Sequence, residues 1–436
     1  MSETSATDRW AAPAMRTRLR RRHAAERRFR RLGAAAVGFA MLALALLLTS
    51  IAANGWSAFL RTRIALDVTY SPDVVGELST LPPPEMAVAS SQTDWQALVR
   101  NALLREFPEV TGRGPLRALQ ALVSPGARTR VRERFLADPS LAGRTVTLEV
   151  PADDELDMIE KGLVARDLAP EQARLSPEQL GWFATLEARG RVHRGFDASF
   201  LTSGDSREPE LAGVGGAIVG SLLTLIVTLA VAFPLGVAAA VYLEEFAPHN
   251  RWTEVIEVNI NNLAAVPSIV FGLLGLAVFL GFFGLPRSAP LVGGLTLALM
   301  TLPTIIIAGR SAIAAVPPSI REAARGLGAS PLQIVVHHVL PLALPGILTG
   351  TIIGMARALG ETAPLLMIGM VAFVVDVPGS FAEAATALPV QIFLWADSPE
   401  RGFVEKVSGA ILVLLAFLIL MNGAAIALRQ RFERRW

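Results

Sequence analysis

The chain has 436 residues, of which 52% are hydrophobic and only 18% are charged, and its mean hydropathy is +0.46. A typical soluble domain carries about 25% charged residues, so these figures exclude a wholly soluble enzyme and a disordered chain. The absence of cysteine excludes disulfides, thiolate metal sites and cysteine nucleophiles. The five histidines never fall at zinc-ligand spacing, and the net charge of +2 argues against a nucleic-acid partner.

Six stretches of the chain are apolar enough to cross a membrane, for which a helix needs about 20 residues. Five of them are uncharged, and the sixth, residues 345–373, is interrupted only by Arg357 and Glu361. We therefore predict six transmembrane helices. The second run is longer than a bilayer requires, so we expect it to tilt or project, with a bend at Pro234. The five uncharged runs are residues 32–60, 211–243, 258–286, 288–309 and 407–428.

Ten arginines precede the first run, and the positive-inside rule places them in the cytoplasm. Six spans return the C-terminal arginines and the loop carrying Arg321 and Arg325 to the same side, so both termini are expected in the cytoplasm. A cleaved signal peptide ending near Ser50-Ile51-Ala52 is the alternative, but its apolar core would be too long and its basic segment too extended. The basic residues are Arg9, Arg16, Arg18, Arg20, Arg21, Arg22, Arg27, Arg28, Arg30 and Arg31 at one end and Arg429, Arg431, Arg434 and Arg435 at the other.

Residues 61–210 have the composition of a soluble domain and form an insert between the first two spans. Residues 64–70 and 145–150 alternate in the manner of strands, and residues 94–107 have helical periodicity. Ser176 with Gln179 forms a capping box, with Pro177 at the first helical position. We expect an extracytoplasmic α+β insert without a catalytic set, serving as a docking or shielding module; a ligand sensor is the alternative.

The loop at residues 316–341 contains two helix starts. Ser319 with Glu322 is one predicted capping box, and Ser330 with Gln333, followed by Pro331, is another. Gly326 and Gly328 lie where the first helix must stop and turn. The sequence predicts two short helices, closed by Pro341 and Pro345. Ile334, Val335 and Val339 give the second helix an apolar side, for which we expect a protein partner.

The same loop carries a family signature, Glu-Ala-Ala followed at fixed spacing by glycine and Leu-Pro, and it resembles the coupling loop of ABC importer permeases. In that family two short helices insert into a cleft on the ATPase subunit. His338 departs from the usual isoleucine, which leaves the detailed packing open, and a plain connector is the alternative. The resemblance assigns ATPase coupling to Glu322, Ala323, Ala324, Gly328, Ser330, Pro331, Leu340 and Pro341.

A Walker A loop needs a lysine followed by serine or threonine, yet the only lysines, Lys161 and Lys406, precede glycine and valine. The chain is therefore expected to have no ATPase site and to be no enzyme. It is also expected to bind no cofactor or metal itself, with ATP and magnesium held by a partner ATPase.

Arg357 and Glu361 stand four residues apart in the predicted fifth span, about 18 Å and 24 Å from its start if it begins near Pro345. Each charge costs about 2.5 to 3.5 kcal/mol near the bilayer centre, whereas an i, i+4 pair returns about 0.2 to 0.5 kcal/mol. The pair should therefore face other helices or a water-filled path. Arginine presents a fork that fits an oxyanion, and Glu361 could hold it or accept a proton from the substrate; a static salt bridge is the alternative.

Residues 357–364, together with residues 233–245 and 265–273, look like permeases of the bacterial phosphate-specific transport system, in particular the A-type subunit. The resemblance implies an all-α polytopic membrane protein of the bacterial cytoplasmic (inner) membrane, with the six helices of the type I ABC importer permease fold. It implies a second phosphate permease subunit, a pair of ATPase subunits and an extracytoplasmic phosphate-binding protein as partners, in addition to membrane lipid. The candidate substrate path is Arg357, Glu361, Thr362, Asn262 and Arg310.

Arg310 has the alternative role of a topology anchor at the cytoplasmic interface. Asn259, Asn261 and Asn262 open the predicted third span, where buried amides more often tie helices together than touch substrate. The expected organisation is a cytoplasmic arginine-rich segment (1–31), span 1 (32–60), the insert (61–210), the permease core (211–430) and a cytoplasmic tail (431–436). Permeases for sulfate or molybdate, a membrane-anchored sensor and a secondary transporter are the rival interpretations.

Overall fold

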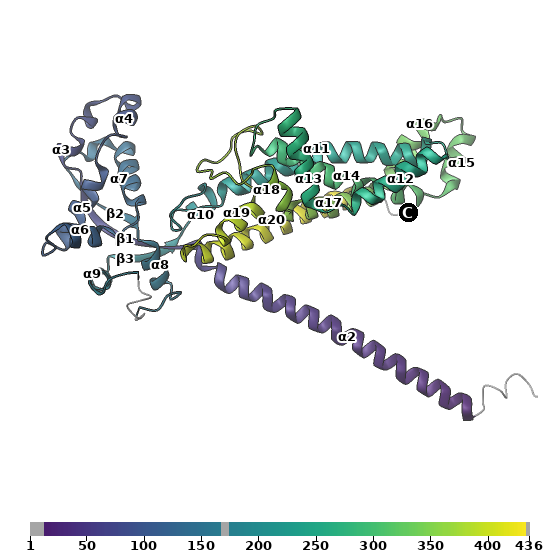
Figure 1. Cartoon of the computed structure of the whole chain (residues 1–436), viewed down its shortest axis with the longest axis horizontal. Coiled ribbons are helices and arrows are strands. Elements are labelled where there is room, and N and C mark those ends of the chain that lie inside the picture. The colour runs from purple at the N-terminus through teal and green to yellow at the C-terminus, as the bar shows by residue number, and fades with distance from the viewer. Residues whose placement is uncertain (1–12, 167–173, 433–436) are drawn as a thin grey trace, which may run out of the picture. The chain divides into compact units, whose positions relative to one another are not determined.

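The computed structural model describes residues 13–166 and 174–432, and the chain forms two compact units that meet between Asn54 and Gly55. The described part of the first unit is the long helix α2 (Pro13–Gly55; Figure 1), of which only the last residue, Gly55, is assigned to the second unit. Its 43 residues span about 65 Å, so the arginine-rich segment and the first predicted span share one continuous helix. Arg9, Arg434 and Arg435, which belong to the predicted basic ends, lie outside the described residues.

The insert is built on a three-stranded antiparallel sheet with the order β2-β1-β3. The strands are β1 (Leu60–Thr69), β2 (Thr145–Pro151) and β3 (Val192–Phe196). Leu66 pairs with Leu148 and Ile64 with Val150, so the apolar side chains of both predicted strands share one buried face. Both predicted strands are confirmed; β3 was not predicted because its mostly exposed residues lack a regular apolar alternation.

Helices cover the buried face of this sheet and enclose the core of the insert. Tyr70, Leu98, Phe107 and Phe135 are fully buried there. Asp94 caps the predicted helix by accepting a hydrogen bond from the Ala97 amide, and the predicted Ser176 capping box is present. The helices of the insert are α3 (Pro72–Val75), α4 (Pro83–Ala89), α5 (Trp95–Glu106), α6 (Arg113–Gln120), α7 (Gly126–Ala137), α8 (Asp154–Glu160) and α9 (Pro177–Ala188), whereas α10 (Ser199–Thr202) packs against α11.

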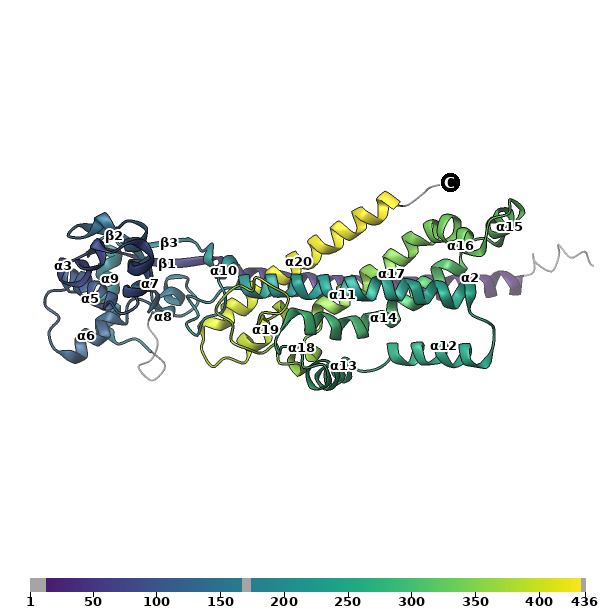
Figure 2. The same ribbon diagram turned by 90° about the horizontal axis from the view of Figure 1, so that it is seen from above.

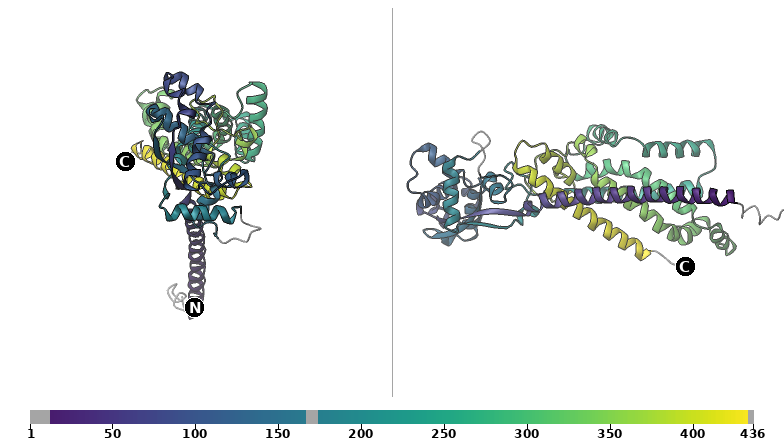
Figure 3. Two further views of the ribbon diagram at one scale, coloured as in Figure 1. Left: turned by 90° about the vertical axis from the view of Figure 1, so that its left-hand side faces the viewer. Right: turned by 90° about the horizontal axis from the view of Figure 1, so that it is seen from below.

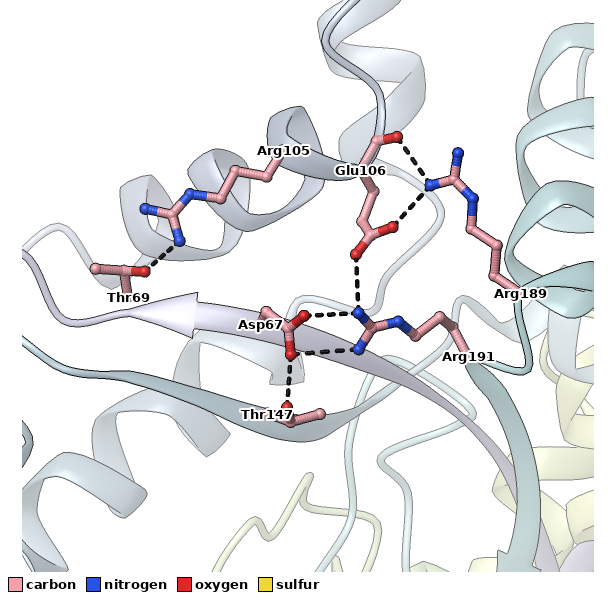
Figure 4. Close-up of polar contacts among 7 residues, drawn as sticks. All are labelled: Asp67, Thr69, Arg105, Glu106, Thr147, Arg189 and Arg191. Carbon is pink, nitrogen blue, oxygen red and sulfur yellow. Dashed lines mark hydrogen bonds and ion pairs between the residues drawn. The ribbon is translucent and has the colours of Figure 1, made fainter.

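A polar network ties the sheet to α5 and to the end of α9 (Figure 4). Arg191 donates to both carboxylate oxygens of Asp67, at 3.2 and 2.6 Å, and its guanidinium lies 3.4 Å from Glu106. Arg189 reaches the carboxylate of Glu106 at 2.8 Å, and Arg105 donates to Thr69. The hydrogen bond from Arg191 holds the pKa of Asp67 below its usual value.

The permease core consists of helices α11 to α20, of which α11, α14 and α17 pack most extensively. Small residues let them approach closely: a Cβ at Gly294 would lie 2.4 Å from Val227 Cβ, and one at Gly350 would lie 2.1 Å from Ala308 Cβ. Helix α11 continues through Pro234 without interruption. The bounds are α11 (Gly215–Val241) with the π-helical turn η4 (Tyr242–Phe246), α14 (Pro290–Ala314), α17 (Leu340–Gly360), α18 (Ala363–Met367), α19 (Leu388–Ala396) and α20 (Gly402–Phe432).

The third predicted span is not one helix. Helix α12 (Arg251–Ala264) is followed by α13 (Ser268–Gly275), which continues as the π-helical η5 (Leu276–Phe282), and the two parts are bent by 103°. Pro267 lies at this break. A residue that precedes a proline disfavours the helical conformation, which explains why α12 ends before it. Figures 2 and 3 show α12 at the edge of the core. Within the described residues, five helices are long and apolar enough to span, or six if the bent pair is one span.

The fifth span also differs from the prediction. The second helix of the predicted hairpin does not close at Pro341, because α16 (Pro331–Ile334) runs through η6 (Val335–Val339) into α17. Together they form one 30-residue helical segment, Pro331–Gly360. Pro341 lies inside this continuous segment, directly after the π-helical η6, so a proline at this position does not end the helix. The segment ends at Gly360 rather than continuing to Phe373.

Candidate functional site

The hairpin formed by α15 (Pro318–Gly326) and α16 carries the signature residues. Helix α15 ends at Gly326, and Gly328 adopts a φ of +81°, which favours glycine at the turn. The Ser330 box is confirmed: the Ser330 hydroxyl accepts from the Gln333 amide, and the Gln333 side chain accepts from the Ser330 amide at 2.9 Å. The Ser319 box is wrong, since α15 already begins at Pro318 with Pro317 at the cap position.

The apolar surface of the hairpin is not the predicted one. Ile334, Val335 and Val339 are at most 4% exposed and pack inside this chain. They are buried because η6 continues into α17 and turns that side toward α14 and α15. The exposed apolar residues are instead Leu327, Leu332 and Val336, with exposed fractions of 90%, 63% and 44%. These three side chains form the unpartnered apolar surface of the hairpin.

The coupling residues divide into two groups by burial. An exposed group lies on α15, at the turn and at the start of α16, and it consists of Glu322, Ala323, Gly328, Ser330 and Pro331. Ala324 is buried, whereas Leu340 and Pro341 are partly buried in the first turn of α17. The second group can therefore shape the hairpin from within, and the first group is open to a partner.

Arg321 clamps the hairpin to the neighbouring helices. Its guanidinium donates to Glu245 in η4 at 2.6 and 3.0 Å, and to the carbonyl oxygens of Val316 and Ile313 at 2.6 and 3.0 Å. The Arg321 and Glu245 side chains are 14% and 12% exposed. One arginine thus fixes the start of α15 to η4 and to the end of α14, and the several N–H groups of its guanidinium make these simultaneous contacts possible.

Arg310 on α14 forms a second link beside this clamp. Its side chain lies 3.3 Å from Glu244 in η4 and 2.9 Å from Glu257 on α12. Arg310 therefore holds three helical segments together, a role that the sequence did not suggest for it. The sequence does contain one indication of this network. Glu244 and Glu245 are adjacent carboxylates at the end of the second apolar run, and such charges in a charge-poor chain indicate ion pairs with basic residues elsewhere.

A groove of about 700 Å³ opens between the end of α14, the start of α15 and the η6–α17 segment. Val316, Ile320 and Leu342 supply apolar walls, and His337 and His338 also line the groove. His338, which departs from the family pattern, is thus an exposed wall residue and not part of the internal packing.

Arg357 and Glu361 lie at the far end of the Pro331–Gly360 segment, and Arg357 is about 39 Å from Pro331 along the helix. Arg357 lies in the last turn of α17, as predicted for a residue inside a helix, but Glu361 is the C-cap just after Gly360, so the predicted position of Glu361 inside a continuous helix is wrong. The Arg357 Nε lies 3.4 Å from Glu361 Oε1, and the Arg357 side chain is 52% exposed. The Glu361 side chain is only 19% exposed and packs into this chain, whereas the Arg357 guanidinium is open to a solute or a second subunit.

The other path candidates are placed separately. Asn262 is exposed on α12, as are Asn259 and Asn261, so the expected burial of these amides is not found in this chain. Asn259 donates to the Val255 carbonyl of its own helix. Thr362 is partly buried next to Glu361 at the start of α18. Arg310 lies in the network near the hairpin, so the structure brings together only Arg357, Glu361 and Thr362.

Among the described residues, no group of three or more histidine, aspartate or glutamate side chains is arranged to hold a metal ion.

Two family models match the chain. Residues 232–436 match the model described as "Binding-protein-dependent transport system inner membrane component", and residues 16–170 match one described as a domain of unknown function (DUF3333). The phosphate transport system permease protein PstA 1 of Mycobacterium tuberculosis is 32% identical over 255 residues, covering 58% of this chain and 81% of that protein. PstA of Mycobacterium leprae is 33% identical, with coverage of 51% and 72%.

PstC of Haemophilus influenzae is 31% identical, covering 46% of this chain and 70% of that protein. These similarities agree with the helical core, the insert and the signature hairpin, and the predicted fold class is confirmed. The chain is a multi-pass inner membrane protein and a transport subunit without an ATPase site. It belongs to the family of binding-protein-dependent transport system inner membrane components, the permease subunits of ABC transporters.

Proposed function

We propose that this chain is the A-type permease subunit of an ATP-driven importer of inorganic phosphate. The observation that carries the proposal is its 32% identity over 81% of the length of a phosphate transport system permease. The exposed hairpin surface and the half-exposed Arg357 at the other end of one helical segment support it, because a permease must contact both an ATPase and a substrate.

The proposed complex contains a second, non-identical phosphate permease, two ATPase subunits and an extracytoplasmic phosphate-binding protein. In the proposed orientation both termini and the hairpin are cytoplasmic and the insert is extracytoplasmic, which follows the distribution of arginines. Leu327, Leu332 and Val336 would contact the ATPase. Movement of the hairpin would reach α11 and α14 through Arg321 and would reach Arg357 through the continuous Pro331–Gly360 segment.

In this proposal Arg357 contacts the translocating oxyanion, and Glu361 positions it or accepts a proton from the substrate. Alternating access requires that the hairpin interact differently with the two states of the ATPase, and not merely bind it tightly. Glu361→Gln should alter transport or selectivity while the complex still assembles, and normal transport by that variant would remove the role proposed for Glu361.

The test is deletion of the gene, followed by uptake of radiolabelled phosphate, sulfate and molybdate at micromolar supply. Wild type and Arg357→Gln are restored separately, and copurified ATPase is measured in each strain. We expect loss of phosphate uptake alone, rescued only by wild type, with ATPase copurifying in both. Loss of sulfate or molybdate uptake with phosphate uptake intact would refute the substrate. Full rescue by Arg357→Gln would refute the proposed role of Arg357.

A further inference from the structure

The insert meets the permease core at a buried ionic joint. The Lys161 ammonium, directly after α8, lies 2.7 Å from Asp157 and 2.8 Å from Glu405 on α20. The three side chains are 1%, 7% and 5% exposed. Asp157 also accepts a hydrogen bond from the Thr62 amide of β1 at 2.8 Å. Lys161 therefore links the sheet and α8 of the insert to the last transmembrane helix.

Close packing surrounds this joint. A Cβ at Gly409 on α20 would lie 2.5 Å from Ala58 Cβ, and a Cβ at Gly402 would lie 2.7 Å from Pro209 Cβ. Lys406, the only other lysine of the chain, is 3% exposed and lies 4.8 Å from the centre of the Phe200 ring. Both lysines of this arginine-rich chain are thus buried at the boundary between the insert and α20. A flexible linker between two domains would not require buried charged side chains, so the boundary is a packed interface.

The same boundary extends to α19 and to the loop before it. Trp395 on α19 donates to Asp205 at 2.9 Å, and the Asp205 amide donates to the Val374 carbonyl. Separating the insert from α20 would take Lys161 away from Glu405 and leave that carboxylate in a low-dielectric site without its ion-pair partner, whereas Lys161 would keep Asp157 within the insert. The insert is also held against sliding along α20. Pro209 and Ala58 pack directly against Gly402 and Gly409, and residues with side chains at these contact points would not leave room for them.

We propose that the insert and the first turns of α20 form one rigid body that moves as a unit through the transport cycle, with Lys161 as its positioning residue. This inference rests on the proposed function, since it assumes a cycle. The insert is then a fixed extension of the permease and not a sensor that swings on a tether, so any protein that docks on it acts directly on α20.

The absence of cysteine makes a crosslinking test direct. Ala58→Cys with Gly409→Cys places two thiols across the joint. Because the added Cβ at residue 409 would lie 2.5 Å from that of residue 58, the two segments must move apart by about 1 Å for a disulfide, and the reduced double variant has to retain transport for the comparison. Closure is measured by loss of free thiols, with the two single-cysteine chains as controls. We expect the oxidised double variant to transport at the rate of the same variant after reduction. A loss of about tenfold or more on oxidation, restored by dithiothreitol, would overturn the rigid-body proposal.

Hydrogen exchange on the unmodified complex gives a second test that does not depend on the substrate or on disulfide closure. It compares the nucleotide-free and ATP-trapped states. We expect protection in α8 and in residues 402–410 to be the same in both states, while protection of the α15–α16 hairpin changes. Exposure of α8 in one state would overturn the proposal even if phosphate transport is confirmed. Absence of phosphate uptake with constant α8 protection would instead overturn only the proposed substrate.

Discussion

Charged networks hold both ends of the permease core, but they differ in burial. At the insert, Lys161 and its two carboxylates are at most 7% exposed. At the hairpin, Arg321 is 14% exposed and Arg310 27%. A fully buried network resists opening because its charges cannot return to water, whereas a partly hydrated one can open at a lower cost. The comparison suggests a permanent joint at the insert and a movable clamp at the hairpin.

The largest effect is expected for Lys161→Met, which removes the ammonium that lies 2.7 Å from the buried Asp157 and 2.8 Å from the buried Glu405. Breaking a buried ion network in this way costs about 3 to 5 kcal/mol. Unfolding of the purified complex, followed by protease sensitivity of the insert, measures the effect. The matched control is Asp157→Asn/Lys161→Met/Glu405→Gln, which removes all three charges and should regain most of the stability. A control as unstable as Lys161→Met would contradict the electrostatic explanation.

Arg321→Met comes next, because it removes the ion pair with Glu245 and two hydrogen bonds to carbonyl oxygens. Hydrogen bonds to charged groups contribute about 1.5 to 3 kcal/mol each. We expect more ATP hydrolysed per ion transported, measured in proteoliposomes. Arg321→Lys should restore the charge but only part of the coupling, since lysine lacks the fork. A ratio unchanged in both variants would show that the clamp does not transmit motion.

Gly328→Val tests the turn between the two hairpin helices. A β-branched residue at a φ of +81° costs about 1 to 2 kcal/mol, so we expect ATPase activity with reduced transport. Gly326→Ala is the matched control, because Gly326 is not among the positive-φ glycines and a Cβ there meets no atom within 4 Å. Equal coupling in the two variants would argue against a role for the turn.

Glu210, at the boundary of the insert, predicts a pH dependence. Burial raises its pKa from 4.5 to about 7, so its contribution to stability is fully present below pH 4.5 and is lost as the pH rises through 7. Glu210→Gln should therefore raise the unfolding temperature at pH 8 and change it little at pH 4.5. Part of the pH dependence should persist in the variant, because burial also raises the pKa of Asp153 to about 7. An equal shift at both pH values would contradict the assignment.

The smallest effect is expected for Arg63→Met. Arg63 lies 3.3 Å from Glu149, and the two side chains are 32% and 51% exposed. Such surface pairs contribute about 0.2 to 1 kcal/mol. Thermal unfolding at low and high salt measures the difference, which should shrink further in salt. A loss comparable to that of Lys161→Met would mean that burial does not rank these networks.

The sequence predicted most of the secondary structure where local signals were strong. The apolar runs identified the long helices, alternation identified β1 and β2, and the Ser176 and Ser330 boxes marked two helix starts. These features depend on neighbouring residues, through side-chain periodicity and capping. The third span was misjudged because an uncharged run does not reveal a break at Pro267, and β3 was missed because its pattern is weak.

The candidate site was predicted less completely. The signature spacing identified the hairpin, but its exposed surface is Leu327, Leu332 and Val336, because tertiary packing buried the side that the sequence favoured. Whether Arg357 contacts substrate stays a prediction. The pairing of Arg321 with Glu245 joins residues 76 positions apart, and no local pattern encodes such a contact.

By itself, the sequence determined that this is a polytopic membrane protein with an inserted α+β domain and a capped, signature-bearing hairpin, because composition, charge and periodicity are local properties. Only the tertiary structure decided that Lys161 meets Glu405, 244 positions away, and that the hairpin is continuous with a transmembrane helix. The physical reason is that a buried charge can be stabilised by any opposite charge that the fold brings within a few ångströms. Folding, and not sequence proximity, selects that partner.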